Sequence, residues 1–497
     1  MSVTSETRKI SIVTIIQYLA IGFYIFIIPA LFGPENYGVL VIVTTSTGIF
    51  SLISDLGITI TIYRYVPQHA ALGQEGKIRG LIHRCNIIRL LTITPFIVLW
   101  IGFFSLLGFN IFIIASGVAI FCGMAFVNFL FSIAYGHGRS GWFTSKNAAR
   151  AVLRLLFLFV GFTVLGLEGA IFSLVLVESL LIIMGLGLVR GDLFGEKEPV
   201  HISSYMRKAS QFWIYDLLFP LYHALSIYIT QFFTISYTQV GYYSFGMDFG
   251  RFMAMFLSSI GIAALPIIIE LMTDGEKQRV TLLVARATKY LAVIAPVIML
   301  WVIFLVPLVI TLIVPSYLIS ISIAQISLLW VFPIGLSTIF SGVVIAKEKP
   351  IIVIKARVLS LTFFLSTAFL IGPFTGITGI AWVYTAGQIV EAASTTGMAS
   401  REFELEFPKR TVLVSTTIAT IIGLTIFLLT PPISIPIIIL IPFTPVYIKI
   451  WVPLFLIHLV LATPIYLVLL IATKALTINE FREITFAIFP IKRKRKS

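Results

Sequence analysis

The chain has 497 residues, of which 59% are hydrophobic and 11% charged, and its mean hydropathy is +1.05. Soluble domains average roughly 45–50% apolar and about 25% charged residues, so this composition excludes a water-soluble globule. The net charge of +14 comes from basic residues in loops between apolar segments, which is typical of a membrane protein and does not indicate a nucleic-acid partner.

A transmembrane helix needs about 20 consecutive apolar residues, and about fourteen segments of the chain meet that requirement. We predict spans at residues 10–32, 38–60, 82–107, 110–135, 147–166, 168–190, 209–234, 240–270, 283–314, 318–346, 350–372, 376–400, 410–430 and 450–474. These spans leave no room for a separate soluble catalytic domain. The sequence therefore predicts an all-α polytopic membrane protein.

The distribution of positive charge predicts the orientation of these spans. Nearly all Lys and Arg residues lie in the two tails and in every second loop, whereas the short turns 33–37, 108–110 and 166–169 contain none. Because cytoplasmic loops carry an excess of Lys and Arg, we predict that both termini are cytoplasmic and that the protein lies in the plasma membrane. Residues 431–449 hold five prolines, which favour an interfacial or re-entrant segment over a spanning helix.

A weak internal repeat recurs at an offset of roughly 200 residues. The segment GPENYGVL at 33–40 is echoed by TQVGYYSF at 238–245, and Gly166 corresponds to Gly376. Glycine turns recur in any polytopic protein, and this is the alternative explanation of the echo.

A duplication of six spans predicts two bundles related by a pseudo-two-fold axis along the membrane normal. The predicted domains are an N-terminal six-helix bundle at 1–200, a C-terminal six-helix bundle at 201–405, and two additional helices with a basic cytoplasmic tail at 406–497. Transporters of this type hold their substrate between the two halves.

Three segments resemble one family in their order and spacing. They are LFGPENYGVLVIV (31–43), SDLGITITIYRYVPQHAALGQEGKIRGLI (54–82) and VGYYSFGMDFGRFMAMFLSSIGIAALPIIIELMTDGEK (240–277). They are similar to the Wzx-type oligosaccharide and polysaccharide flippases of the multidrug/oligosaccharidyl-lipid/polysaccharide exporter superfamily.

The resemblance implies two bundles facing a central cavity and an alternating-access cycle. The implied substrate is a polyprenyl (di)phosphate-linked oligosaccharide, moved from the cytoplasmic to the outer leaflet. The implied partners are membrane lipids and other glycan-assembly membrane proteins. Relatives often carry an Asp in the seventh span, where this chain reads Ser226, Ile227 and Tyr228, so no cation-coupling role is transferred to that position.

Among the arginines inside predicted spans, four are candidates for binding a ligand: Arg89, Arg150, Arg154 and Arg251. A charge within the bilayer costs at least about 2.5 kcal/mol, so each should face a cavity or a partner. A guanidinium can bind phosphate oxygens through two parallel hydrogen bonds and stays charged when partly desolvated. We predict that these arginines bind the phosphate head group. Snorkelling to the interface, or for Arg251 a local ion pair with Asp248, is the alternative.

Four carboxylates are candidates for lining the cavity or coupling transport to an ion. They are Asp55, Asp248, Glu178 and Glu391, of which the last two lie near the middle of corresponding spans. A buried carboxylate can exchange a proton during transport, but it can equally be a hydrogen-bond partner between helices.

Enzyme signatures are missing from the sequence. It contains no GxxxxGK[ST] or HExxH motif, and its two Cys and six His residues have no metal-ligand spacing. We therefore expect a transporter that is not an enzyme and has no cofactor or metal. The alternatives are a multidrug or cation antiporter of the same superfamily and a membrane glycosyltransferase.

Overall fold

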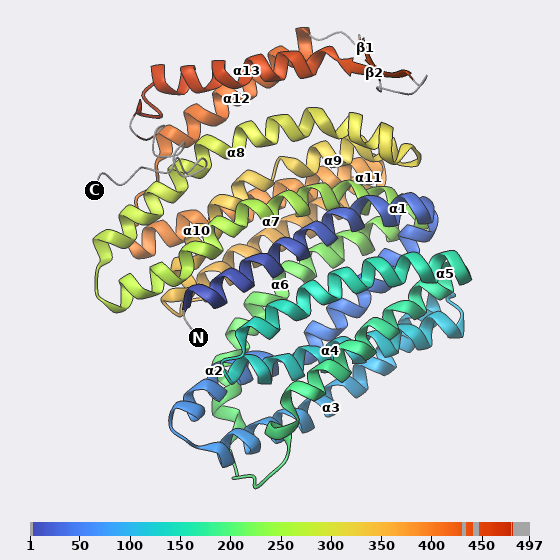
Figure 1. Ribbon diagram of the computed structural model, residues 1–497, viewed down its shortest axis with the longest axis vertical. Helices are drawn as coiled ribbons and strands as arrows, with labels where there is room; N and C mark the ends of the chain where they lie inside the picture. Colours follow the sequence, from blue (N-terminus) through green and yellow to red (C-terminus); the bar gives the residue numbers. More distant parts are fainter. Residues whose placement is uncertain (1–2, 430–433, 441–446, 479, 481–497) are drawn as a thin grey trace. The chain divides into compact units, whose positions relative to one another are not determined.

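The structure is a computed structural model that describes residues 3–429, 434–440, 447–478 and 480, and most of these residues are helical (Figure 1). The elements are α1 (Val3–Asp55), α2 (Ile58–Ala71), α3 (Glu75–Leu106), α4 (Ile111–Gly136), α5 (Ser140–Leu193), α6 (Ile202–Thr234), α7 (Tyr237–Thr273), α8 (Lys277–Ile313), the 3-10 helix η1 (Pro315–Tyr317), α9 (Ser320–Leu328), α10 (Val331–Ala346), α11 (Ile351–Phe403), α12 (Lys409–Leu429), β1 (Ser434–Leu440), β2 (Tyr447–Pro453) and α13 (Leu454–Ala472).

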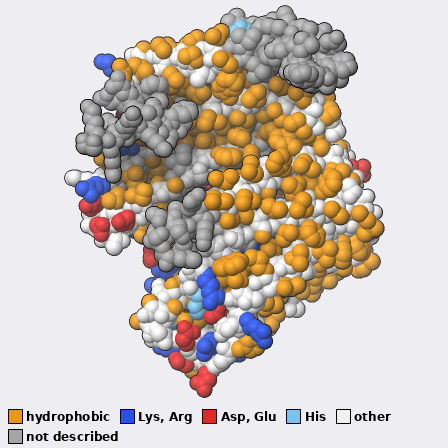
Figure 2. Space-filling view, in the orientation of Figure 1, with side chains coloured by type: hydrophobic (Ala, Val, Ile, Leu, Met, Phe, Trp, Pro, Cys, Tyr) orange, Lys and Arg blue, Asp and Glu red, His pale blue; other side chains and the backbone are white. Residues whose placement is uncertain are grey.

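Ten helical stretches among the described residues are long and apolar enough to cross a membrane. Many of their large apolar side chains are exposed, including Leu91, Val164 and Phe427. Figure 2 shows these apolar surfaces along the helices, with charged side chains gathered near the end where α2 lies. Exposed apolar faces of this extent fit lipid rather than water. The chain is a multi-pass membrane protein, as predicted.

Three helices are about twice as long as one membrane crossing requires. They are α1, α5 and α11, and each contains one residue with non-helical backbone angles, Gly33, Gly166 or Gly376. The φ angles of these glycines are 69°, 64° and 59°, in the left-handed region that residues with a Cβ rarely adopt. Each half is long enough to form its own span, and the count of about fourteen spans stays a prediction.

The breaks in α5 and α11 have similar backbone geometry. The two helices have 54 and 53 residues, and the ψ angles at their breaks are −149° for Gly166 and −156° for Gly376. The turn at Gly166 is tied to the turn before α4, because Asn110 Nδ2 donates to Glu168 Oε1 at 2.6 Å.

The chain divides into two compact units. The first unit comprises the residues up to Asp248 with Ile310–Ile323 and Val353–Gly387, and the second comprises Phe249–Val309, Ala324–Ile352 and the chain from Gln388 onward. These units follow spatial contacts, whereas the domain boundaries predicted near residues 200 and 405 follow a sequence repeat and stay predictions.

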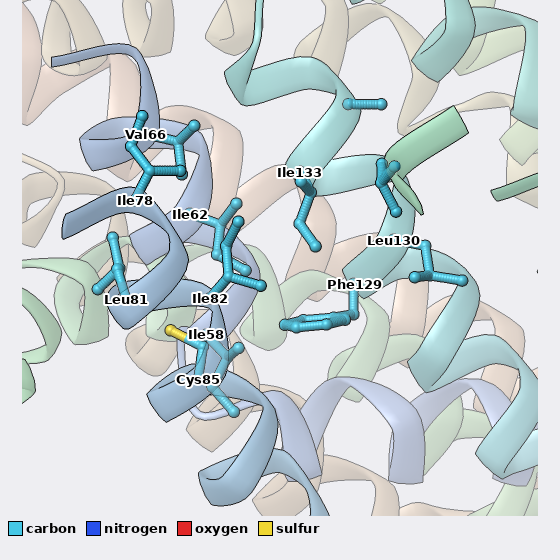
Figure 3. Close-up of a cluster of buried hydrophobic side chains, with 12 residues drawn as sticks. Ile58, Ile62, Val66, Ile78, Leu81, Ile82, Cys85, Phe129, Leu130 and Ile133 are labelled. Carbon is cyan, nitrogen blue, oxygen red and sulfur yellow. The ribbon is translucent and has the colours of Figure 1, made fainter. Parts of the chain in front are cut away.

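A buried hydrophobic core in the first unit holds α2 against α3 and α4 (Figure 3). Ile58, Ile62 and Val66, spaced four residues apart on α2, pack with Cys85 of α3 and Phe129 of α4. Residues at this spacing share one face of a helix. The opposite face of α2 therefore stays outside this core.

The second predicted span is shorter than the sequence indicated. We expected residues 38–60, but α1 ends at Asp55, and Leu56 and Gly57 have φ angles of 46° and 86°. Two consecutive left-handed residues cannot continue a right-handed helix. The chain turns there and begins the separate helix α2.

Glycines allow α1 and α7 to approach closely within the first unit. A Cβ on Gly38 would collide with the carbonyl oxygen of Tyr237, and a Cβ on Gly241 would collide with that of Pro34. Each glycine thus faces the backbone of the other helix. Any larger residue at either position would push the two helices apart.

In the second unit, α12 and α13 pack against α8 through Ala419, Leu459 and Val293. The last predicted span, 450–474, is wrong at its start because β2 occupies Tyr447–Pro453 and pairs antiparallel with β1. Apolar runs of this length do not distinguish a strand from a helix by periodicity. Residues 430–433, 441–446 and the basic tail lie outside the described residues.

Candidate functional site

A cluster of charged side chains connects the two halves of α5. Arg150 and Arg154, one turn apart, donate to the two carboxylate oxygens of Glu178, at 2.7 Å and 3.1 Å. The side chain of Glu178 is 1% exposed, and those of Arg150 and Arg154 are 13% and 26% exposed. Gly123 of α4 lies against Glu178, and a Cβ there would come within 2.8 Å of the Glu178 Cβ. The glycine therefore lets α4 pack closely on the carboxylate.

Lys146 extends the cluster by one turn, since residues four apart lie on the same helix face. Its ammonium group donates to Asn128 Oδ1 of α4 at 3.2 Å and lies 4.3 Å from the ring centroid of Phe143. Leu158 on the same face is fully buried, while Phe159 on the opposite side is exposed. The cationic face of α5 thus points into the protein. The sequence analysis missed Lys146, although its spacing from Arg150 could have revealed it.

The cluster carries more positive than negative charge. Guanidinium groups remain protonated in proteins, so Arg150 and Arg154 alone outnumber the single carboxylate of Glu178. A buried charge without a partner costs several kcal/mol. The Nε atoms of both arginines, like that of Arg89, are also buried without a hydrogen-bond partner within the described residues. An anion bound here would supply both the missing charge and the missing acceptors.

Arg89 of α3 has a different environment. Its guanidinium donates to Asp55 at the end of α1, to the carbonyl oxygen of Ala125 in α4, and to Thr59 Oγ1 at 3.2 Å. The side chain is 1% exposed, and its guanidinium carbon lies 5.0 Å from the ring centroid of Phe129. These contacts account for Arg89 without a ligand. Its role in phosphate binding stays a prediction that the contacts do not favour.

The remaining predicted site residues belong to helices other than α5. Asp248 of α7 accepts a hydrogen bond from Tyr37 of α1 at 2.6 Å. Arg251 of α7 is half-buried and Glu391 of α11 is buried, and both belong to the second unit. Their predicted roles stay predictions.

The described part of the chain contains no group of three or more His, Cys, Asp or Glu residues that could hold a metal ion. Cys85 and Cys122 are both free thiols.

Comparison with solved structures defines the class of fold. The chain matches the structure titled "Lipid II flippase MurJ, inward closed conformation" with a TM-score of 0.69 at 13% identity, covering 96% of this chain and 99% of that one. An inward-facing multidrug resistance MATE family transporter of the MOP superfamily gives 0.62 at 14% identity, with coverage of 78% and 94%. The Vibrio cholerae MATE transporter VcmN gives 0.57 at 15% identity, with coverage of 81% and 98%. The fold is therefore the one that these flippase and transporter structures share.

The sequence defines the family. Residues 6–272, more than half of the chain, match the family described as "Polysaccharide biosynthesis protein", and the chain belongs to that family. The predicted family resemblance and fold class are confirmed. No curated protein sequence matches the chain.

Proposed function

We propose that the protein is a flippase that moves a polyprenyl (di)phosphate-linked oligosaccharide from the cytoplasmic to the outer leaflet by alternating access. Membership in a polysaccharide biosynthesis family supports a glycan substrate, and the fold it shares with a lipid II flippase supports a lipid-linked one. The observation that carries the proposal is the excess positive charge of the α5 cluster. It provides a buried site for an anionic head group within an apolar protein.

The α5 cluster has enough N–H hydrogen-bond donors to bind a phosphate. A guanidinium has five N–H donors, and the ion pairs to Glu178 use one terminal nitrogen of Arg150 and one of Arg154. The remaining donors and the charge excess can bind phosphate oxygens through charge-assisted hydrogen bonds. Arg154, as the more exposed of the two, is the first contact for an entering head group.

The contacts between α1 and α7 support an alternating-access cycle. The charge distribution predicts that the turns at 33–37 and 236–240 face outward. In that orientation, two sets of contacts hold α1 and α7 together near the outer face of the membrane and would close the predicted cavity on that side. They are the reciprocal contacts of Gly38 and Gly241 and the hydrogen bond from Tyr37 to Asp248. In the proposed cycle these contacts separate when the head group is released to the outer leaflet.

The carboxylates are secondary candidates in this mechanism. Asp55, Asp248 and Glu391 are proposed to line the cavity or to couple transport to an ion, and Glu178 positions the two arginines. With both termini predicted to be cytoplasmic, Arg150 and Arg154 are expected to lie one to two turns inside the inner boundary of the membrane. This depth suits a head group that enters from the inner leaflet.

A multidrug or cation antiporter is the second candidate, because MATE transporters share the fold. A cationic substrate needs a negatively charged site. The two arginines and Lys146 around one carboxylate give the opposite sign, so the α5 cluster favours the flippase.

Reconstitution tests the proposal directly. The purified protein is placed in vesicles with a fluorescent polyprenyl diphosphate sugar, and transfer between leaflets is followed by adding a membrane-impermeant quencher. We expect the double variant R150A/R154A to transfer the lipid at least about tenfold more slowly, since charge-assisted hydrogen bonds contribute about 1.5–3 kcal/mol each.

Arg279→Ala is the matched control, because it removes an arginine that is 71% exposed and is paired with Glu276, the residue just before α8. We expect its transfer rate to equal that of the wild type. Unchanged transfer in R150A/R154A would contradict the proposal. Transport of a cationic dye by the wild-type protein, without lipid transfer, would favour the antiporter.

A further inference from the structure

The first unit contains a pocket whose lining residues are not part of the proposed phosphate site. Its volume is about 390 Å³, and it is lined by Ile60, Tyr63 and Arg64 of α2, Tyr135 of α4, Phe143 of α5 and Phe212 of α6. The other face of α2 is fixed in the hydrophobic core shown in Figure 3. The pocket-lining face of α2 is therefore held in place from behind.

Three aromatic rings of the pocket pack against one another. The ring centroids of Tyr63 and Tyr135 are 4.9 Å apart, those of Tyr63 and Phe143 are 5.5 Å apart, and those of Tyr135 and Phe143 are 5.7 Å apart. The guanidinium carbon of Arg64 lies 5.8 Å from the ring centroid of Phe212. The pocket thus combines flat apolar surfaces with one cation.

Among the residues that the structure describes, no hydrogen-bond partner is found for two hydroxyl groups of the pocket residues, those of Tyr63 and Tyr135. Tyrosine hydroxyls that face a pocket in this state can donate to, or accept from, a hydroxylated ligand.

The pocket adjoins the α5 cluster. Phe143 lines the pocket, and its ring centroid lies 4.3 Å from the ammonium group of Lys146, the first residue of the cationic face. A ligand with one part in each site needs an anionic group joined closely to an uncharged, hydroxyl-rich group. Arg64 and Lys146 disfavour a cationic aromatic compound in the same place.

We propose that this pocket binds the sugar ring nearest the phosphate while the α5 cluster binds the phosphate itself; this inference rests on the proposed function. A pyranose has an apolar C–H face that stacks on an aromatic ring and a rim of hydroxyl groups that form hydrogen bonds. The three packed rings supply the first contact, and Tyr63, Tyr135 and Arg64 supply the second. A volume of 390 Å³ lies at the small end of ligand sites, which suits one or two sugar rings.

Titration calorimetry with the purified full-length protein tests the pocket. The probes are dodecyl diphosphate and dodecyl diphosphate carrying glucose or N-acetylglucosamine. We expect the wild type to bind at least one glycosylated probe about fivefold to tenfold more tightly than the sugar-free probe. Phe143→Leu, which removes a ring but keeps the site apolar, should lose this preference, measured as the ratio of its affinities for the glycosylated and sugar-free probes.

Trp142→Leu is the matched control, since Trp142 is the exposed aromatic neighbour of Phe143 and does not line the pocket. It should keep the preference. If Phe143→Leu does not fold, the variant Y63F/Y135F keeps all rings, removes both hydroxyl groups and should reduce the preference about threefold or more.

The two proposals fail in different ways. Equal affinity of the wild type for all three probes, or an unchanged preference in the pocket variants, would overturn the sugar site. The proposed function fails if dodecyl diphosphate does not bind, or if R150A/R154A binds it as tightly as the wild type.

Discussion

The first unit contains two buried arginine sites that the sequence did not distinguish. At one, Arg89 meets one carboxylate, Asp55, and its guanidinium also donates to a backbone carbonyl. At the other, Arg150 and Arg154 share one carboxylate, Glu178. Arg89 is 1% exposed, whereas Arg154 is 26% exposed.

The difference shows what separates a structural arginine from one that can bind a ligand. Both sites lie inside predicted spans, so depth in the membrane gives the same indication for each. The charge of Arg89 is balanced by Asp55 and both of its terminal nitrogens have acceptors, whereas one carboxylate, Glu178, faces two guanidinium groups in the α5 cluster. The Nε atoms of all three arginines are buried without a hydrogen-bond partner among the described residues, so they do not separate the two sites. Charge balance, rather than depth, is therefore the basis on which we propose a structural role for Arg89 and a ligand-binding role for Arg150 and Arg154.

The largest expected effect is on stability at the balanced site. Arg89→Ala leaves the Asp55 carboxylate without its ion-pair partner, and we expect a loss of about 3–5 kcal/mol in the free energy of unfolding. Denaturant unfolding in detergent measures this. The double variant R89L/D55L removes both charges together and should recover most of the lost stability. An R89A protein as stable as the wild type would contradict a structural role for Arg89.

Glu178→Gln tests the α5 cluster by removing its carboxylate. It leaves the two guanidinium groups of Arg150 and Arg154 without a counter-charge, and we expect a loss of about 2 kcal/mol. Because pyrophosphate can replace the carboxylate, its addition should raise the melting temperature of this variant more than that of the wild type.

The control for Glu178→Gln is Asp55→Asn, which removes the carboxylate at the sealed site. Pyrophosphate should not restore its melting temperature, because Arg89 is almost fully buried. Equal stabilisation of both variants by pyrophosphate would show that the two sites do not differ in access to an anion.

Arg154→Ala should have a smaller effect on stability than either change. Glu178 keeps its ion pair with Arg150, and the lost bond involves a partly exposed group, so we expect a loss of about 1 kcal/mol or less. The increase in melting temperature with pyrophosphate should nevertheless fall by at least half. A loss of stability as large as that of Arg89→Ala, with an unchanged pyrophosphate effect, would assign Arg154 a structural role.

Much of the fold could be predicted because it depends on local properties of the sequence. Apolar runs indicated the helices, and turn glycines such as Gly166 and Gly376 indicated where long helices break. The errors have physical causes as well. The apolar run before α13 contains a strand, and hydropathy alone does not distinguish a strand from a helix.

The partners of the arginines could not be predicted, because they depend on contacts between distant segments. Asp55 is 34 residues from Arg89, and the carbonyl of Ala125 is 36 residues from it. The Glu178 partner of Arg150 is 28 residues away, across the break in α5. The aromatic residues around the pocket come from four helices and show no shared spacing. Only Lys146 had a local signal, its helical spacing from Arg150.

The smallest expected effect is at a more exposed ion pair in the second unit, where Lys289 donates to Glu480 at 2.6 Å. Burial acts to raise the pKa of Glu480, but hydrogen bonds from Lys289 and Thr477 outweigh it and lower the pKa below its ordinary value of 4.5. The ionised carboxylate therefore contributes stability above about pH 4.5, and this contribution is lost as the pH falls through the lowered pKa.

Glu480→Gln should accordingly cost less than about 1 kcal/mol at pH 7, and the difference from the wild type should disappear in acid. Melting temperatures of both proteins between pH 7 and pH 3 measure this, and a difference that persists at pH 3 would contradict the ion-pair explanation. When water reaches an ion pair in the folded state as well as in the unfolded state, removing one partner changes the free energy of unfolding little. The stability loss should therefore be smallest at Glu480, whose side chain is 26% exposed, and larger at Glu178 and Arg89, whose side chains are each 1% exposed.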